Sequence, residues 1–306
     1  MVFDKTGKIT NNLYMLGIPA MPVYLMDAEK PAVFDAGLAF LGQRYVEDIK
    51  KILGPRPLAY CFLTHSHFDH CGSVSVLKAK FPSLKVVAAE KAKHVLKRPN
   101  AIRLIRELTR AAREAAYDGG RDAKENARFE PFDVDVVLHD GDTIQLSNDL
   151  TVKALDTPGH TWDCLSYYFP LKKILMCSEA AGVPDQTGEI ISDFLVDYDR
   201  YVDSMRRLNG LDVEVVCLGH RFAFAGDDAR SYIPQAIASC EAFLRRVEDC
   251  FVAEAGDLQK VIQHVKKFEY DDKEGPKQLE AAYTLNLEAR IKIIEKRLSV
   301  KASPKN

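Results

Sequence analysis

The first third of the chain alternates short apolar runs with segments of helical spacing. The apolar runs predict strands at Leu13–Gly17, Val23–Met26, Ala32–Phe34 and Ala59–Leu63. From Leu41 to Leu53, apolar residues recur three and four positions apart, which predicts a helix that ends at Gly54. Because strands and helices alternate in this way, the pattern indicates a layered α/β domain.

Later parts of the chain differ in pattern. Residues from about 90 to 127 are helical and charged, so they are expected to form an insertion between strands. Strands return between 134 and 176 and at Val213–Leu218, and the pattern after Gly226 is helical. We therefore expect an α/β domain over residues 1–226, a helical C-terminal extension over 227–298 and a disordered tail over 299–306.

Two apolar stripes follow the expected C-terminal helices. Their members are Ile233, Ile237, Cys240, Leu244, Val247 and Phe251 in the first and Leu287, Ile291, Ile294 and Leu298 in the second. Spacings of three and four place each set on one helix face. Packing on the parent domain is the simpler interpretation, and a homodimer interface or a lid over the functional site is the alternative.

The residues with the most distinctive chemistry are clustered directly after the apolar run Ala59–Leu63. They are His65, His67, Asp69 and His70, and the whole chain has eight histidines. On an extended segment alternate side chains point the same way, so His65 and His67 are expected to face one point. Imidazole and carboxylate groups are common ligands of zinc, iron and manganese. The cluster predicts a metal site, in which Asp69 is also the candidate catalytic residue because it can orient water or move a proton.

Three other strand ends carry candidate ligands. His160 follows a strand and the stiff turn Pro158-Gly159, and His220 follows Val213–Leu218 and Gly219. Glu179 ends the apolar run that begins at Ile174, and its two carboxylate oxygens can bridge two metal ions. Other histidines lack a strand-end context and are expected at ordinary surface or packing positions: His94, His139 and His264.

Composition narrows the class of protein. The net charge is −2, with 42 basic and 44 acidic residues, so nothing indicates a nucleic-acid partner. No apolar run approaches the roughly 20 residues of a membrane-spanning helix, and no secretory signal is visible at the N-terminus. The seven cysteines are odd in number and form no C-x-x-C pair, which is typical of a reducing compartment. We expect a cytoplasmic protein without a membrane partner.

These motifs, in this order, resemble those of the metallo-β-lactamase-fold hydrolases over roughly residues 11–225. The resemblance is carried by Val33–Gly37, Thr64–His70, Pro158–His160, Glu179 and Gly219-His220. It implies a four-layer αβ/βα sandwich with a binuclear site at one edge. Two divalent ions are implied as cofactors, zinc by family usage, while iron or manganese would suit the same ligands. One ion would be held by His65, His67 and His160, and the other by Asp69, His70 and His220.

The sequence departs from the family pattern at the bridging ligand. That ligand is usually Asp within a Gly-Asp pair, whereas this chain has Ser178-Glu179, so the carboxylate stands one methylene further from the backbone. Within the family, the layout is most similar to the thioesterases of the bacterial alkylquinolone quorum-sensing pathway. The similarity lies in the Thr64–Gly72 run, the helical insertion and the long helical C-terminus. Glyoxalase II, which also cleaves thioesters, is a wider relative.

Taken together, the residues and the resemblance predict a hydrolase that uses a metal-bound hydroxide, with a thioester or related acyl compound as its small-molecule substrate. Four arginines of the insertion share one helix face: Arg103, Arg106, Arg110 and Arg113. This face is either a solvated one paired with Glu107 and Glu114 or a positive rim for an anionic substrate such as a coenzyme A thioester. Phosphodiester or lactone hydrolysis and a non-catalytic, metal-binding regulatory role are the alternatives.

Overall fold

The computed structural model describes residues 1–116, 128–185, 187–275, 277–278 and 280–302. Its internal contacts divide the chain into two compact units. Unit 1 comprises residues 1–157, 163–178 and 212–232, and unit 2 comprises residues 158–162, 179–211 and the chain from 233 onward. Helix α7 (Asp227–Ala253) begins one residue after the domain boundary expected at 226, and that boundary stays a prediction. Among the helices of the described residues, none combines the length and apolar composition that crossing a bilayer requires.

The N-terminal sheet of unit 1 has the strand order β2-β3-β4-β5-β6-β7-β8. The strands are β2 (Gly7–Lys8), β3 (Leu13–Ile18), β4 (Met21–Met26), β5 (Ala32–Phe34), β6 (Tyr60–Phe62), β7 (Lys85–Ala89) and β8 (Val136–Leu138). Neighbouring strands are antiparallel from β2 to β5 and parallel from β5 to β8. Because β5 and β6 are parallel, the residues that follow both strands lie at the same edge of the sheet.

The second sheet of unit 1 has the strand order β1-β16-β15-β12-β11-β10-β9. The strands are β1 (Val2–Phe3), β9 (Thr143–Ser147), β10 (Leu150–Asp156), β11 (Leu165–Phe169), β12 (Ile174–Met176), β15 (Val215–Cys217) and β16 (Ala223–Ala225). Only β12 and β15 are parallel neighbours in this sheet, so the residues after these two strands also share an edge. The strands expected between 134 and 176 and at Val213–Leu218 are confirmed.

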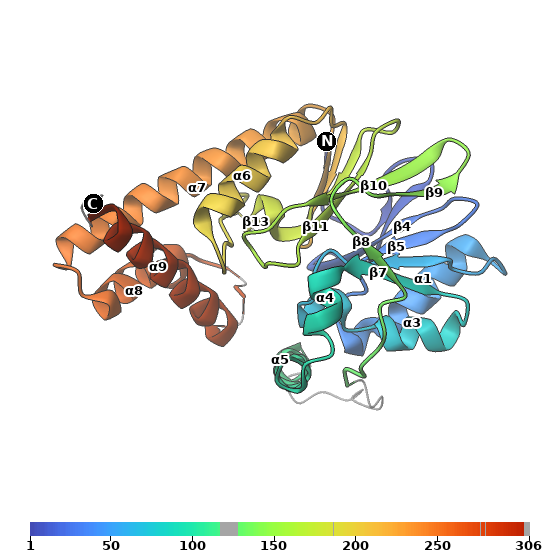
Figure 1. The fold of residues 1–306 in the computed structure, drawn as a ribbon, viewed down its shortest axis with the longest axis horizontal. Helices are drawn as coiled ribbons and strands as arrows, with labels where there is room; N and C mark the ends of the chain where they lie inside the picture. Colours follow the sequence, from blue (N-terminus) through green and yellow to red (C-terminus); the bar gives the residue numbers. More distant parts are fainter. Residues whose placement is uncertain (117–127, 186, 276, 279, 303–306) are drawn as a thin grey trace. The chain divides into compact units, whose positions relative to one another are not determined.

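Helices cover the N-terminal sheet. The helical segments of unit 1 before the insertion are η1 (Ala39–Leu41), α1 (Gly42–Leu53), α2 (Phe68–Cys71) and α3 (Val74–Lys80). Helices α1 and α3 contact each other and lie side by side in Figure 1. Tyr45, Val46 and Ile49 are buried on one face of α1, as the apolar spacing of this segment predicts. The helix expected from Leu41 to Leu53 is therefore confirmed.

An aromatic cluster joins the two sheets of unit 1. The rings of Phe34 and Phe62, on neighbouring strands, stack with their centroids 4.9 Å apart and 9° between their planes. The Tyr167 ring, from the second sheet, lies 5.5 Å from Phe34 and 5.2 Å from Phe62. All three side chains are buried. Burial of each aromatic side chain stabilises the folded state by roughly 1.5–3 kcal/mol. The cluster therefore helps to hold the two sheets together near the strand ends that carry the candidate site.

The expected insertion contains α4 (Glu90–Val95) and α5 (Pro99–Ala116), and its remaining residues, 117–127, lie outside the described residues. On α5, the guanidinium of Arg103 lies 3.9 Å from the carboxylate of Glu107, and that of Arg110 lies 4.0 Å from Glu114. All four side chains are exposed. The predicted surface ion pairs between arginines of this face and Glu107 and Glu114 are therefore confirmed. The role of the face as a rim for an anionic substrate stays a prediction.

Unit 2 is mainly helical. Its elements are η2 (Ser178–Ala181, entered from unit 1), β13 (Val183–Pro184), β14 (Ile190–Ile191), α6 (Tyr198–Asn209), most of α7, α8 (Leu258–Lys266), the π-helical turn η3 (Lys267–Asp271) and α9 (Glu280–Ala302). Helix α9 contacts α6 and α8. Its residues Leu287, Ile291 and Ile294 are fully buried, so this apolar stripe packs within the chain. A homodimer through these helices stays a prediction.

The C-terminus differs in part from the expectation. Helix α9 extends to Ala302, so four residues of the segment expected to be disordered are helical. Residues 299–302 contain no glycine or proline, so no local stop signal ends the helix at the predicted position. Residues 303–306 lie outside the described residues.

Candidate metal centre

The ends of two parallel strands bring a carboxylate and a histidine cluster together in unit 1. Asp35 directly follows β5, and the segment from Thr64 to His70 follows β6. Strand β6 ends before the histidines, and helix α2 begins at Phe68, so His65 and His67 lie in the connection between strand and helix. Their rings are nevertheless neighbours, with centroids 4.5 Å apart. The His65 ring also lies 4.3 Å from the His70 ring.

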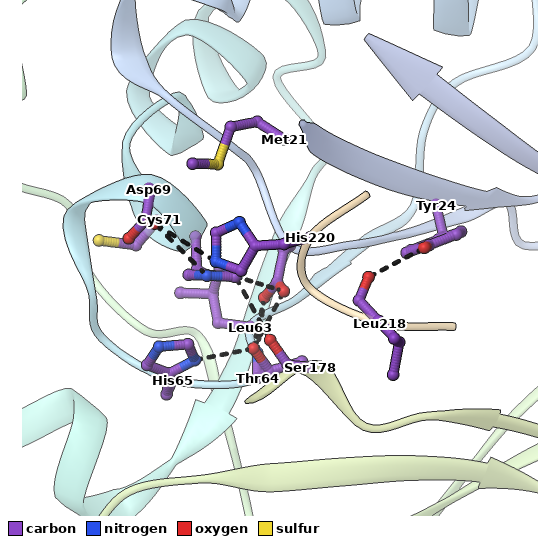
Figure 2. A network of polar contacts seen from close by, with 12 residues as sticks. Met21, Tyr24, Leu63, Thr64, His65, Asp69, Cys71, Ser178, Leu218 and His220 are labelled. Carbon is purple, nitrogen blue, oxygen red and sulfur yellow. Dashed lines mark hydrogen bonds and ion pairs between the residues drawn. The ribbon is translucent and has the colours of Figure 1, made fainter. Parts of the chain in front are cut away.

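The second sheet brings His220 to the same cluster. Its ring centroid lies 5.4 Å from that of His70. The Asp69 carboxylate is 3.8 Å from Nε2 of His70 and 3.7 Å from Nε2 of His220. Asp69, His70 and His220 thus offer three ligand atoms within 4.8 Å of one another, and Figure 2 shows the side chains of Asp69 and His220 on this side of the cluster. A single ion can be held by three donors at such separations.

Asp35 is the principal outer partner of this cluster. Its carboxylate accepts a hydrogen bond from Nδ1 of His70 at 2.8 Å and two from the N–H and hydroxyl of Thr64 at 2.8 and 2.9 Å. Asp35 is buried and has a positive φ of 61°. Metal-binding histidines usually donate their second ring nitrogen to such a group, which fixes the tautomer and the ring orientation.

His220 and His65 also have an outer hydrogen-bond partner on Nδ1. Nδ1 of His220 lies 3.2 Å from the carbonyl oxygen of Ala20, and Nδ1 of His65 lies 3.0 Å from the Thr64 hydroxyl. A carbonyl oxygen can only accept, so Nδ1 of His220 carries the proton and Nε2 carries the lone pair. The donor set and its outer partners therefore fit a divalent metal ion.

The loop that carries His220 is anchored to the N-terminal sheet. The hydroxyl of Tyr24, on β4, donates to the carbonyl oxygen of Leu218 at 2.9 Å (Figure 2). Burial raises the pKa of Tyr24 well above its usual value, so the phenol remains a donor. Ser178, which follows β12, has its hydroxyl 3.5 Å from Nδ1 of His70 and a left-handed φ of 47°. Glycine adopts this backbone conformation without a steric penalty, so Ser178 occupies a position in the turn where glycine would be favoured.

His160 and Glu179 belong to unit 2. Nδ1 of His160 donates to the carbonyl oxygen of Asp193 at 2.6 Å and lies 3.4 Å from its carboxylate, so Nε2 is the nitrogen that a metal ion would use. Glu179 is buried, and its backbone oxygen accepts a hydrogen bond from the hydroxyl of Tyr201 at 2.9 Å. Both environments suit a ligand, and the metal roles of His160 and Glu179 stay predictions, as do those of the candidate ligands in unit 1.

Residues without a strand-end context lie elsewhere, as predicted. Side chains of His94, His139 and His264 are exposed.

Cys71 is buried and its thiol donates to the carbonyl oxygen of Ser66 at 3.6 Å. Burial, followed by the charge of Asp69, raises the pKa of Cys71 well above its usual value, which favours a packing role over a thiolate ligand.

Sequence reasoning missed the outer partners. The sequence pattern marks Asp35 only as part of a turn, and it assigns no role to Tyr24, Asp193 or Tyr201. An acidic residue at the end of a buried strand is the one signal that was available for Asp35. Asp193 and Tyr201 acquire their roles through tertiary contacts that no local motif indicates.

Two seven-stranded sheets whose adjoining edges carry a histidine and carboxylate cluster define a metal-binding α/β protein of the αβ/βα type. The chain belongs to the metallo-beta-lactamase superfamily, whose family model matches residues 22–220. The α/β fold class and the membership implied by the resemblance are therefore confirmed. Proteins of this superfamily are generally metal-dependent hydrolases that act on small molecules, which supports an enzymatic function for this chain.

Similarity to individual proteins is distant. A metallo-beta-lactamase family protein from Thermus thermophilus superposes with a TM-score of 0.67 at 17% identity, over 98% of this chain and 97% of the other. A hydroxyacylglutathione hydrolase from Rhodopseudomonas palustris is 29% identical over 117 residues, which are 38% of this chain and 31% of that protein. A putative diflavin flavoprotein from Thermosynechococcus vestitus is 33% identical over 67 residues, 22% of this chain and 12% of that protein. The chain spans between 12% and 60% of the length of four curated relatives.

Proposed function

We propose that this protein is a hydrolase with a binuclear metal site that cleaves a thioester or a related acyl compound. The observation that carries the proposal is the convergence of Asp69, His70 and His220 within 4.8 Å, with His70 oriented by Asp35. One ion is assigned to His65, His67 and His160, and the other to Asp69, His70 and His220. Glu179 is assigned as the bridge. Zinc is the first candidate metal, and iron or manganese would suit the same donors.

Chain connectivity supports the inclusion of the two ligands from unit 2. Glu179 directly follows Ser178, so their Cα atoms are about 3.8 Å apart. The loop with His160 begins after Thr157 and returns at Asp163, and the N–H of Thr157 donates to the carbonyl oxygen of Cys164 at 3.0 Å. His160 therefore lies within about 11 Å of Thr157 along the chain.

Divalent ions in such a donor set supply a Lewis acid and a strong nucleophile at neutral pH. The contribution of the protein is to hold the donors and to handle protons. Asp69 lies between His70 and His220, where its carboxylate can orient the attacking water and accept its proton. Asp35 keeps the His70 ring in one tautomer and orientation throughout.

A thioester suits this set of residues better than an ester or amide. A thiolate is a good leaving group, so its departure needs little acid assistance, and the acids described at the site are the assigned ligands and their outer partners Asp35 and Asp193. The hydroxyacylglutathione hydrolase relative, by its name, acts on a glutathione thioester. The arginines of α5 are a candidate contact for an anionic thiol carrier.

Elemental analysis combined with a substrate panel tests the proposal. Metal-replete protein is expected to contain two ions per chain and to hydrolyse acyl thioesters faster than lactones or phosphodiesters. His67→Ala is expected to abolish both metal retention and turnover, whereas His94→Ala, at an exposed position, retains them. Full activity of His67→Ala in metal-free buffer would refute the proposal.

The same measurements address the role of Glu179 and the rival functions. Glu179→Gln is expected to lower the metal content from two ions to one, because an amide is a poorer bridging group than a carboxylate. Preference for a lactone or a phosphodiester would identify the alternative hydrolase class. Absence of turnover from the whole panel by protein that holds two ions would favour the metal-binding regulatory role.

A further inference from the structure

A continuous path of hydrogen bonds joins His160 to Glu179 through Tyr201, entirely within unit 2. The His160 ring donates from Nδ1 to the carbonyl oxygen of Asp193 at 2.6 Å. The N–H of Asp193 donates to the hydroxyl of Tyr201 at 3.3 Å, and that hydroxyl donates to the backbone oxygen of Glu179 at 2.9 Å. A phenol can donate one hydrogen bond and accept others, so one oxygen atom serves both segments.

The position of the Tyr201 hydroxyl is itself fixed by packing. Tyr201 lies in the first turns of α6, which is capped by the Asp197 side chain, and its side chain is fully buried. Gly159 packs against its backbone so closely that a Cβ at Gly159 would lie 2.4 Å from Cα of Tyr201. The carbonyl oxygen of Gly159 also accepts from the N–H groups of Leu195 and Val196 at 3.1 Å. The turn before His160 and the start of α6 therefore form one rigid body.

Other contacts hold the Asp193 segment independently of Tyr201. The buried guanidinium of Arg290 donates to the carbonyl oxygen of Ser192 at 3.1 Å. The side-chain amide of Asn286 lies 3.4 Å from the Asp193 carboxylate. Removal of the Tyr201 hydroxyl alone therefore takes away the link to Glu179 while the rest of the segment remains supported.

We propose that Tyr201 is a positioning residue for the metal site, whose hydroxyl sets the spacing of the segments that carry His160 and Glu179. The inference rests on the proposed function, in which these two residues are ligands. It also gives the unusual glutamate a defined support: its backbone oxygen is held by Tyr201 and by the N–H of Gly182 at 3.0 Å, so the longer side chain starts from a fixed point. Outer-shell groups of this kind typically change metal affinity 10- to 100-fold.

Tyr201→Phe is the direct test, because it removes the hydroxyl and keeps the ring. Tyr168→Phe is the matched control: Tyr168 is also buried, and its hydroxyl donates to the carbonyl oxygen of Asp212 at 2.7 Å, in a segment with no proposed ligand. Affinity for Zn²⁺ is measured by competition with a chromophoric chelator for the wild-type chain and both variants. Melting temperatures of the metal-free proteins report the structural effect separately.

The expected result is a loss of Zn²⁺ affinity of about 10- to 100-fold in Tyr201→Phe and none in Tyr168→Phe, with similar melting temperatures for the two metal-free variants. Wild-type affinity in Tyr201→Phe, when the wild type itself binds two ions, would overturn the inference and leave the proposed function standing. A wild-type protein that binds no Zn²⁺ would overturn both. Failure of metal-free Tyr201→Phe to fold would also overturn the inference, because the hydroxyl would then serve the fold.

Discussion

Nδ1 of His70 and the carboxylate of Asp35 lie 2.8 Å apart, although 35 positions separate the two residues in the sequence. The same carboxylate accepts two hydrogen bonds from Thr64, the residue before His65. Asp35 therefore connects the backbone at the start of the histidine cluster with one of its rings. This relationship makes Asp35 the outer residue whose replacement is expected to have the largest effect on metal binding.

Asp35→Asn is expected to weaken metal affinity by about 10- to 100-fold, because an amide oxygen is a weaker acceptor than a carboxylate for the hydrogen bond that orients the His70 ring. Asparagine tolerates the positive φ of this position, so the backbone turn is retained. Chelator competition measures the change. Asp135→Asn is a suitable control, since Asp135 accepts from the N–H of Val86 and pairs with Lys78 rather than with a histidine. Equal affinities of the two variants would contradict the role of Asp35.

Gly72→Ala is expected to destabilise the protein by about 2 kcal/mol, because overpacking at a rigid contact has a cost of that order. A Cβ at Gly72 would lie 2.6 Å from the backbone nitrogen of Ala39 and from the carbonyl oxygen of Phe68. Urea unfolding of the metal-free protein measures the change. Gly210→Ala, where the nearest atom is 3.4 Å away, should alter stability by less than about 0.5 kcal/mol. Equal effects at the two glycines would argue against close packing around α2.

Arg290→Met is expected to destabilise the chain by about 3–5 kcal/mol, because it leaves the Glu269 carboxylate buried without its cationic partner and with the Tyr283 hydroxyl as a remaining donor at 2.7 Å. The guanidinium makes two hydrogen bonds to Glu269, at 3.0 and 2.5 Å, and its side chain is 1% exposed. The double variant Arg290→Met/Glu269→Gln removes both charges and should recover at least half of the loss. Thermal unfolding compares the three proteins, and a double variant no more stable than the single one would contradict this explanation.

The thiols of the native protein are expected to react slowly with a disulfide reagent at pH 8. All seven cysteines are buried, and burial raises the pKa of Cys240 to about 12. A raised thiol pKa keeps the sulfur protonated at pH 8, so the reaction rate should still be rising with pH above 9. Seven thiols should titrate rapidly after unfolding in denaturant. Rapid reaction of a thiol in the native state would contradict the buried environments described for these cysteines.

Whether a site residue can be predicted from the sequence depends on how far apart in the chain the interacting residues lie. His65, His67, Asp69 and His70 could be recognised because their residue types and spacing follow one apolar run. The location of His220 after a strand and a glycine could be recognised for the same reason. By contrast, the outer partners Asp35, Asp193 and Tyr201 are ordinary residues in the sequence, and their roles arise only when distant segments meet.

Helix boundaries show the same dependence. The end of α1 at Leu53 is signalled locally by Gly54 and Pro55, and the prediction was confirmed there. Helix α9 continues to Ala302 through residues that carry no local stop signal, and the predicted end at 298 was too early. The assignment of all seven candidate ligands, and of Asp69 as the catalytic residue, stays a prediction that metal analysis and activity measurements will decide.

A metal ion bound at the strand ends of unit 1 would affect the folding of the chain as well as its chemistry. Asp69 and His70 extend from one sheet and His220 from the other, and residues 70 and 220 are 150 positions apart in the sequence. An ion shared by these side chains acts as a reversible cross-link that closes a very long loop. The free energy of unfolding then depends on the supply of metal, rising by about 2.7 kcal/mol when free metal reaches 100 times its dissociation constant. Chelation would thus loosen the two sheets, which would tie the lifetime of the folded protein to the metal status of its surroundings.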